Sequence, residues 1–150
     1  MDKKIFDKEL EGNIIAAMIM ERGCFEKAQE KGIAPDDFVH PAFNKAYNIM
    51  FTNNINDYVS ISSAIDNEMQ AQEIKEEVLG FISSASFNHW LTLLLVKSAH
   101  RKLKNLGDEI PRIVHEDGSI EEKIDRVNAK LMENKITKNF GIPKLAKDIS

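Results

Sequence analysis

The sequence predicts an all-α protein, a compact bundle of about five short helices followed by a projecting antiparallel helical hairpin. Apolar residues recur three and four positions apart through most of the chain, which is the spacing of one face of an α-helix. No segment alternates apolar and polar residues for long enough to predict a strand. Helix-capping signals, such as Ser119 followed three residues later by Glu122, separate the periodic stretches. Together these observations exclude a sheet-based fold.

The short helices are predicted in a globular head formed by residues 1–86. The first runs from Glu9 to Met20, and Gly23 is expected to end it because glycine tolerates positive φ. A single helical turn is expected around Pro35. The remaining head helices are expected at residues 25–31, from Pro41 onward, after Ser60 as an N-cap, and at residues 73–84.

Residues 87–136 are predicted to form the hairpin. Its first helix, residues 88–115, carries one long apolar stripe. A tight turn at residues 116–118 leads to the capping box at Ser119, and the second helix carries an apolar stripe of its own. Two helices joined by a tight turn are expected to pack antiparallel. Residues 137–150 look like the start of a linker.

Composition limits the function classes. The 150 residues carry a net charge of −4 with a pI near 5.6, which argues against binding nucleic acid through bulk positive charge. Cys24 is the single cysteine, so neither an internal disulfide nor a cysteine-rich metal site is expected. No apolar run is long enough for a signal peptide or a membrane span. We therefore expect a cytoplasmic protein with no membrane partner.

The motifs of catalysis are missing from the sequence. It contains no Gly-x-x-x-x-Gly-Lys-Ser/Thr loop, no His-Glu-x-x-His pair and no Gly-x-Ser-x-Gly turn. Its carboxylate doublets are adjacent in sequence, and adjacent residues on a helix do not face each other. Its four histidines stand singly. We therefore predict no catalytic, cofactor-binding or metal-binding residues and no cofactor.

A basic cluster lies on the first hairpin helix. It consists of Lys97, Arg101, Lys102 and Lys104, with His100 among them. A solvated helix face is the favoured interpretation, because no aromatic residues alternate with these cations as they would on a platform for single-stranded nucleic acid. Contact with DNA or with an acidic partner stays open as the alternative.

Several sequence segments resemble one family in order and spacing. They are the run Glu11-Gly12-Asn13-Ile14-Ile15-Ala16-Ala17-Met18, the segment Asp37-Phe38-Val39-His40-Pro41-Ala42, the step Asp57-Tyr58-Val59-Ser60-Ile61, and Val96-Lys97 followed by Arg101-Lys102-Leu103. This series, which extends from about Leu10 to Ile136, is similar to the N-terminal domain of DnaB-type replicative DNA helicases. Phe43-Asn44 and the single Gly80 depart from the family pattern and indicate a distant member, such as a viral or plasmid-borne one.

The resemblance implies a non-catalytic collar domain. In that family, hairpins pair between subunits, the N-terminal domains form a collar on a hexameric ring, and the collar docks DnaG-type primase or a helicase loader. An ATPase motor follows the linker and is absent from this chain. The resemblance assigns subunit pairing to the apolar hairpin residues, which are Leu91, Leu95, Leu103, Leu106, Ile110, Ile120, Ile124, Val127 and Leu131.

Two other functions stay open from the sequence. One is a stand-alone adaptor or inhibitor with the same fold that binds a helicase or primase. A reading frame continuing into a phosphate-binding loop would exclude it. The other is a helical nucleic-acid-binding protein that uses the cluster around Arg101, with salt-dependent binding as its signature.

Overall fold

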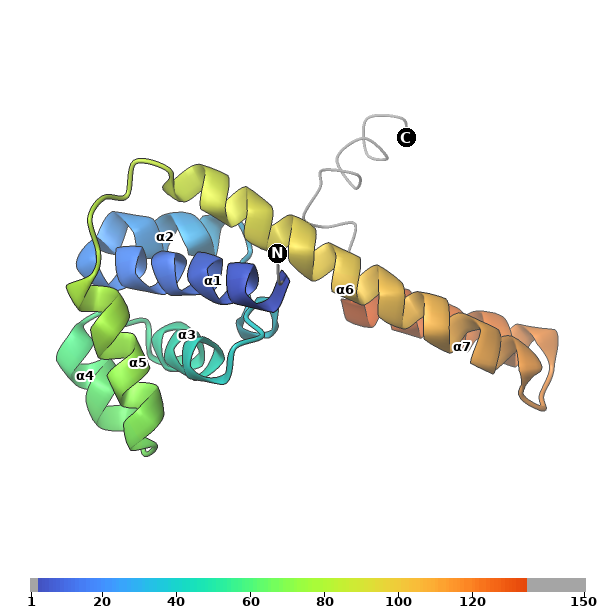
Figure 1. The fold of residues 1–150 in the computed structure, drawn as a ribbon. Coiled ribbons are helices and arrows are strands. Elements are labelled where there is room, and N and C mark those ends of the chain that lie inside the picture. Colours follow the sequence, from blue (N-terminus) through green and yellow to red (C-terminus); the bar gives the residue numbers. More distant parts are fainter. Residues whose placement is uncertain (1–2, 135–150) are drawn as a thin grey trace. The chain divides into compact units, whose positions relative to one another are not determined.

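The computed structural model describes residues 3–134, which form helices joined by turns and loops and contain no strand. The predicted all-α class is therefore confirmed. The elements are α1 (Lys3–Met20), α2 (Arg22–Glu30), the 3-10 helix η1 (Pro35–Asp37), α3 (Pro41–Asn53), α4 (Tyr58–Ala64), α5 (Glu68–Leu79), α6 (Phe87–His115) and α7 (Ile120–Asn134) (Figure 1).

The chain divides into two compact units, Met1–Leu95 and Val96–Ser150, which we call the head and the hairpin unit. The division falls inside α6, later than the boundary expected after residue 86. The reason is that Leu91, Leu94 and Leu95 are buried in the core of the head. The predicted linker, residues 137–150, lies outside the described residues.

The core of the head forms around α1, which packs against α2, α3 and α5 (Figure 1). Ile14, Ile15 and Met18 of α1 are completely buried. Aromatic rings fill the space beside α3, and the buried Tyr47 hydroxyl donates a hydrogen bond of 2.8 Å to the carbonyl oxygen of Ile33. Burial of these large side chains supplies the main stabilising contribution of the head.

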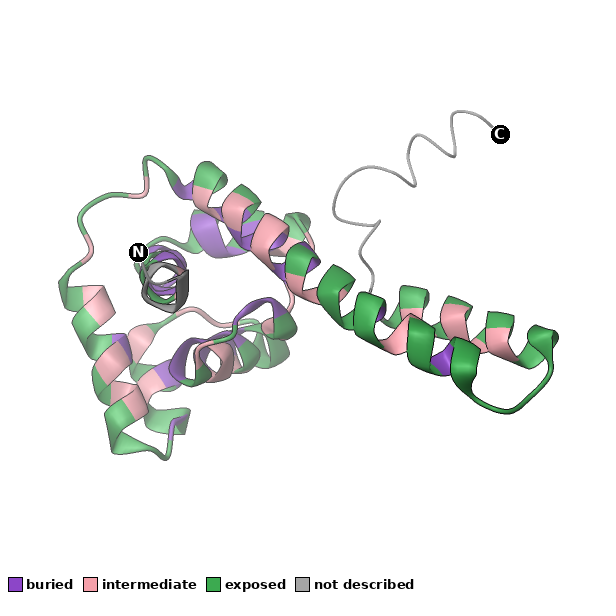
Figure 2. Ribbon diagram, turned by 45° about the vertical axis from the view of Figure 1, so that its right-hand side comes forward, coloured by how far each residue is buried: buried purple, intermediate pink, exposed green. Residues whose placement is uncertain are grey.

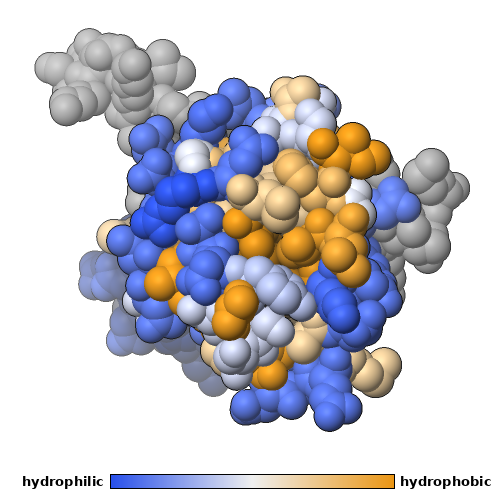
Figure 3. All heavy atoms as spheres, turned by 90° about the vertical axis from the view of Figure 1, so that its left-hand side faces the viewer, coloured by the Kyte–Doolittle hydropathy of each residue, from blue (hydrophilic) through white to orange (hydrophobic). Residues whose placement is uncertain are grey.

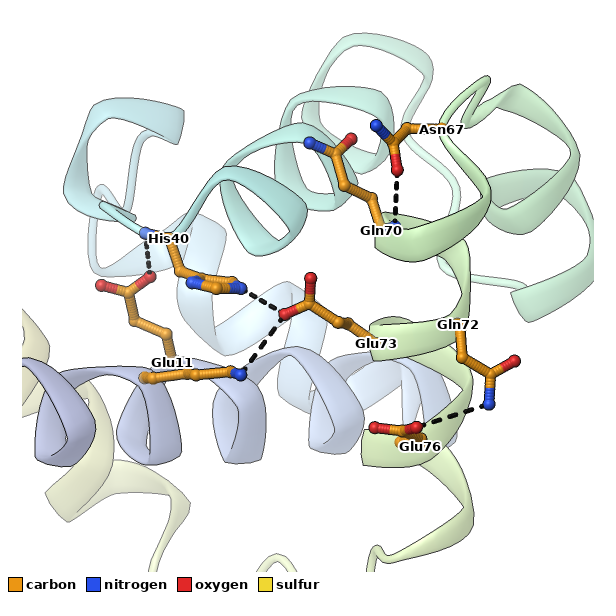
Figure 4. Close-up of polar contacts among 8 residues, drawn as sticks. Glu11, His40, Asn67, Gln70, Gln72, Glu73 and Glu76 are labelled. Carbon is orange, nitrogen blue, oxygen red and sulfur yellow. Dashed lines mark hydrogen bonds and ion pairs between the residues drawn. The ribbon is translucent and has the colours of Figure 1, made fainter.

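A buried carboxylate joins α1 to the start of α3. Glu11, with 1% of its surface exposed, accepts hydrogen bonds from the backbone N–H groups of Val39 and His40 at 3.0–3.1 Å. The His40 side chain contacts Glu73 of α5, whose carboxylate also lies 3.5 Å from the ammonium group of Lys8 (Figure 4). The glutamate of the resembling motif therefore has a structural role, since it satisfies amides at the entry to a helix.

Two predicted signals at helix ends were wrong. Gly23 lies inside α2 and does not end α1, because the chain already breaks at Glu21, whose backbone is extended (φ −135°, ψ 113°). Asp57, and not Ser60, caps α4: its carboxylate accepts a 2.9 Å hydrogen bond from the Ser60 N–H.

The fifth head helix begins and ends earlier than predicted. It spans Glu68–Leu79 because Asn67 caps its first turn, accepting a 3.0 Å hydrogen bond from the Gln70 N–H. Residues 80–86 are not helical and connect α5 to α6. Phe81, which the periodicity assigned to a helix face, thus lies on this connection, partly buried against the core.

Candidate assembly site in the hairpin unit

The turn between α6 and α7 is held by a glycine with positive φ and by side chains that cap the two helix ends. Gly118 adopts a positive φ of 140°, which side-chain-bearing residues rarely reach. The Ser119 hydroxyl accepts a 3.2 Å hydrogen bond from the Glu122 N–H, as its capping sequence predicts. Lys123 donates a 2.8 Å hydrogen bond to the carbonyl of Val114 at the end of α6. With these contacts, α7 runs back antiparallel to α6, so the predicted hairpin is present (Figure 1).

One side of the hairpin is polar and held by ion pairs between its helices. Lys130 of α7 lies 3.1 Å from the Glu109 carboxylate of α6, and Arg126 pairs with Glu116. The hydrogen bond to Glu109 and its negative charge raise the pKa of Lys130. Exposed pairs of this kind add little stability singly, but opposite charges at matching positions favour one register of the two helices.

The other side of the hairpin is an open apolar groove. Its volume is about 350 Å³, and Val114, Ile120, Ile124 and Val127 line it together with Lys123 and Asn128. Ile120 is 75% exposed and Ile124 is 54% exposed. Figure 2 shows exposed residues along much of both hairpin helices. Two helices cannot cover all of this apolar surface, and exposed apolar surface of this kind is typical of an interaction site.

The nine residues expected to pair subunits fall into three environments. Leu91 and Leu95 belong to the core of the head, so their side chains are already covered. Leu106 is buried, and Ile110 and Val127 are half-buried within the hairpin unit. Four remain exposed on its surface: Leu103, Ile120, Ile124 and Leu131. We call these four residues and Val114 the exposed stripe.

Sequence reasoning missed one inward-facing residue, Ile113. Only 6% of it is exposed, whereas 53% of its neighbour Val114 is exposed, and the apolar residues named from the sequence included Ile110 but not Ile113. Leu106, Ile110 and Ile113 follow the spacing i, i+4, i+7, which is equally compatible with an α-helix. Glu109 and Arg112 lie with Ile113 on the polar side of the hairpin. Their charges were the signal that could have distinguished the line through Ile113 from one through Val114.

The residues of the basic cluster differ in exposure. Lys97, Arg101 and Lys102 are half-buried, and each already has a polar or electrostatic interaction within the chain. Lys104 is exposed. Contact of this cluster with DNA or an acidic partner therefore stays a prediction.

The described residues offer neither a metal-binding group nor a membrane span. Between residues 3 and 134, no three His, Cys, Asp or Glu side chains are grouped so that they could hold a metal ion. None of the helices described is both long and apolar enough to cross a bilayer.

Comparison with known proteins adds one finding about the fold. Neither a protein-family model nor a curated protein matches the sequence. Among solved structures, the chain is similar to the N-terminal domain of DnaB helicase from Mycobacterium tuberculosis, with a TM-score of 0.67 and 16% identity. The similarity covers 82% of this chain and 94% of that domain.

The fold is that of a DnaB N-terminal domain. The resemblance seen in the short sequence segments is confirmed at the level of the fold. Because the similarity includes nearly all of the DnaB domain, it cannot be limited to a shared helical fragment. A bare pair of helices would be a much weaker basis for comparison, since helical hairpins occur in many unrelated folds.

Proposed function

We propose that this chain is a DnaB-like N-terminal domain that assembles a replicative DNA helicase by pairing hairpins between subunits, and that docks a primase or a helicase loader. The observation that carries the proposal is the DnaB-like fold over 82% of the chain. This role requires no catalytic residue in this domain, because the implied helicase would hydrolyse ATP in a separate motor.

The exposed stripe supports the pairing part of the proposal. A second hairpin could cover Ile120 and Ile124, whose side chains now line an open groove. The same patch on two copies would make an isologous contact, the interface type of a two-fold dimer. Leu91 and Leu95 are left out of this interface because the head already buries them.

Cross-linking tests the pairing directly. The native Cys24 is buried, so Ile120→Cys would place a single accessible thiol in the proposed interface. Val59 is 71% exposed on the head, and Val59→Cys serves as the matched control. We expect a short bis-maleimide to give a covalent dimer with Ile120→Cys and little with Val59→Cys. Equal yields from the two variants would contradict hairpin pairing.

The docking part of the proposal needs a different test. Isothermal titration of the chain with the primase and with the helicase loader of its own organism should detect complex formation with one of them. Binding of neither partner by a chain that does pair through its hairpin would remove docking from the proposal and retain assembly.

A further inference from the structure

The head carries an apolar hollow far from the exposed stripe in sequence. It has a volume of about 300 Å³ and lies between Asn13 of α1, the α5–α6 connection and Trp90 of α6. Phe81 and Trp90, partly buried against the core, form the apolar part of its lining, and Asn13, Ser83 and Ser86 form the polar part. Ile82, also in the lining, is 94% exposed. Ile82 is the most exposed large apolar residue among those described in the head, and it stands beside a hollow that a partner could fill.

Apolar surface gathers on this side of the head. Figure 3 shows one continuous area of apolar side chains on the face where α1 and α5 end. Leu79, the last residue of α5, is 74% exposed, and Met20, the last residue of α1, is 51% exposed. Leu79 directly precedes Gly80, Phe81 and Ile82 of the hollow, so exposed apolar surface continues beside the hollow, as expected for a protein-docking site.

An acidic groove lies one helical turn away from the hollow. It is lined by Glu9, Glu73, Glu76 and Glu77, together with Lys8 and the ring of Phe43. Along α1, Glu9 precedes Asn13 by four residues, and Glu76 of α5 precedes Gly80, the residue directly after that helix, by four. Residues four apart on a helix are neighbours on its surface. The two depressions thus follow one another along the same pair of helices.

The acidic groove is short of positive charge. Lys8, the only lysine or arginine among the residues that line the groove, lies 3.5 Å from Glu73, which the His40 side chain also contacts (Figure 4). Burial raises the pKa of Glu77, Lys8 opposes this, and the charges of Glu76, Glu9 and Glu73 raise it further. Residues 1–95 as a whole carry 15 Asp and Glu against 8 Lys and Arg, a net charge of −7. A cationic partner would relieve this repulsion.

We propose that the hollow and the acidic groove together bind a basic amphipathic helix of a partner protein. One apolar side chain of that helix fills the hollow beside Trp90, and a lysine or arginine one turn away lies over Glu9 and Glu76. A helix presents side chains three and four residues apart on one face, which matches the one-turn offset between the two depressions. The inference deepens the docking part of the proposed function and is independent of hairpin pairing.

Fluorescence of the full 150-residue chain tests this proposal. Trp90 is the only tryptophan, so its emission reports directly on the hollow. The probe is a synthetic helical peptide with leucine and lysine on one face at i, i+3 and i+4 spacing, and the control peptide has glutamate in place of lysine. We expect the lysine peptide to shift Trp90 emission with a Kd of about 10–100 µM that weakens at high salt, and the glutamate peptide to have no effect.

Three variants locate the binding surface. Ile82→Ser and Glu76→Gln should each weaken binding about fivefold or more, which corresponds to about 1 kcal/mol. Val59→Ser should leave it unchanged, because Val59 is 71% exposed but lies on α4, which contributes no residue to either depression. Circular dichroism checks that each variant remains folded.

Several results would overturn the proposal. These are no binding of the lysine peptide up to 1 mM, equal binding of the two peptides, or equal weakening by Ile82→Ser and Val59→Ser. The solution mass, measured on the same samples, reports separately on hairpin pairing. If the chain pairs but does not bind the lysine peptide, only this inference is refuted. If the chain does not pair but binds the lysine peptide, only hairpin pairing is refuted.

Discussion

The head and the hairpin unit contain similar apolar residues but bury them to different extents. In the head, large side chains such as Phe43, Tyr47 and Ile14 are completely buried against one another. In the hairpin unit, Leu106 and Ile113 are covered, but Ile120, Ile124 and Leu131 remain largely in solvent. Two antiparallel helices have one shared interface, whereas a bundle has several. The core of the head is therefore closed within one unit, whereas the hairpin unit leaves apolar surface that a partner could cover.

The largest expected effect contrasts two leucines of the same helix. Leu91→Ala should cost about 2–5 kcal/mol in the free energy of unfolding, because it opens a cavity in the core of the head. Leu103→Ala should cost less than about 1 kcal/mol in dilute protein, because Leu103 is 53% exposed. Urea unfolding followed by circular dichroism measures both. Similar losses from the two variants would break the contrast between head and hairpin.

The next effect concerns the buried carboxylate of the head. Glu11→Ala should destabilise the chain by about 2–3 kcal/mol, since it leaves the amides of Val39 and His40 without their charged acceptor. Glu11→Gln keeps one acceptor oxygen and should cost less. Thermal unfolding of the two variants measures the difference, and a neutral Glu11→Ala would show that water can replace the carboxylate.

A helix cap in the head should have a smaller effect. Asn67→Ala removes the acceptor of the Gln70 N–H and should cost about 1 kcal/mol. Asn67→Ser retains a capping oxygen and should restore most of the stability. Should alanine and serine behave alike in urea unfolding, the start of α5 would not depend on this cap.

The smallest effect depends on pH. The pKa of Glu77 is raised in the folded chain, mainly by burial, so the folded state favours the protonated form more than the unfolded state does. Glu77→Gln should therefore stabilise the chain at neutral pH, by less than about 1 kcal/mol because water screens a half-buried carboxylate. The advantage should shrink as the pH falls through the raised pKa and vanish below the ordinary pKa near 4.5. If Glu77→Gln stabilised the chain equally at every pH, the result would contradict a raised pKa for Glu77.

The sequence predicted most of what depends on neighbours in the chain. The long helix α6, the turn at Gly118 and the cap at Ser119 all follow from local spacing and capping chemistry. Where two local signals competed, the prediction failed: Asp57 caps α4 although Ser60 could also serve as a cap. Local sequence ranks such alternatives poorly, because their free energies differ by less than about 1 kcal/mol.

The candidate sites were harder to predict because they combine distant segments. The apolar hollow joins Asn13, Ile82 and Trp90, and no spacing rule connects residues so far apart. The apolar stripe of the hairpin was predicted, but in the structure some of its residues are buried and others are exposed. Leu91 is in the core of the head while Ile124 lines an open groove. That distinction depends on which unit each part of α6 belongs to.

Solution mass tests most directly the proposal that a second copy of the chain covers the exposed stripe. Light scattering over a concentration series should give a dimer or larger assembly for the chain and a folded monomer for Ile124→Glu, because a carboxylate cannot be buried unpaired in an apolar contact. Val59→Glu, on an exposed position of the head, should keep the assembled mass. A chain that is monomeric at every concentration, or an Ile124→Glu variant with unchanged mass, would contradict the claim.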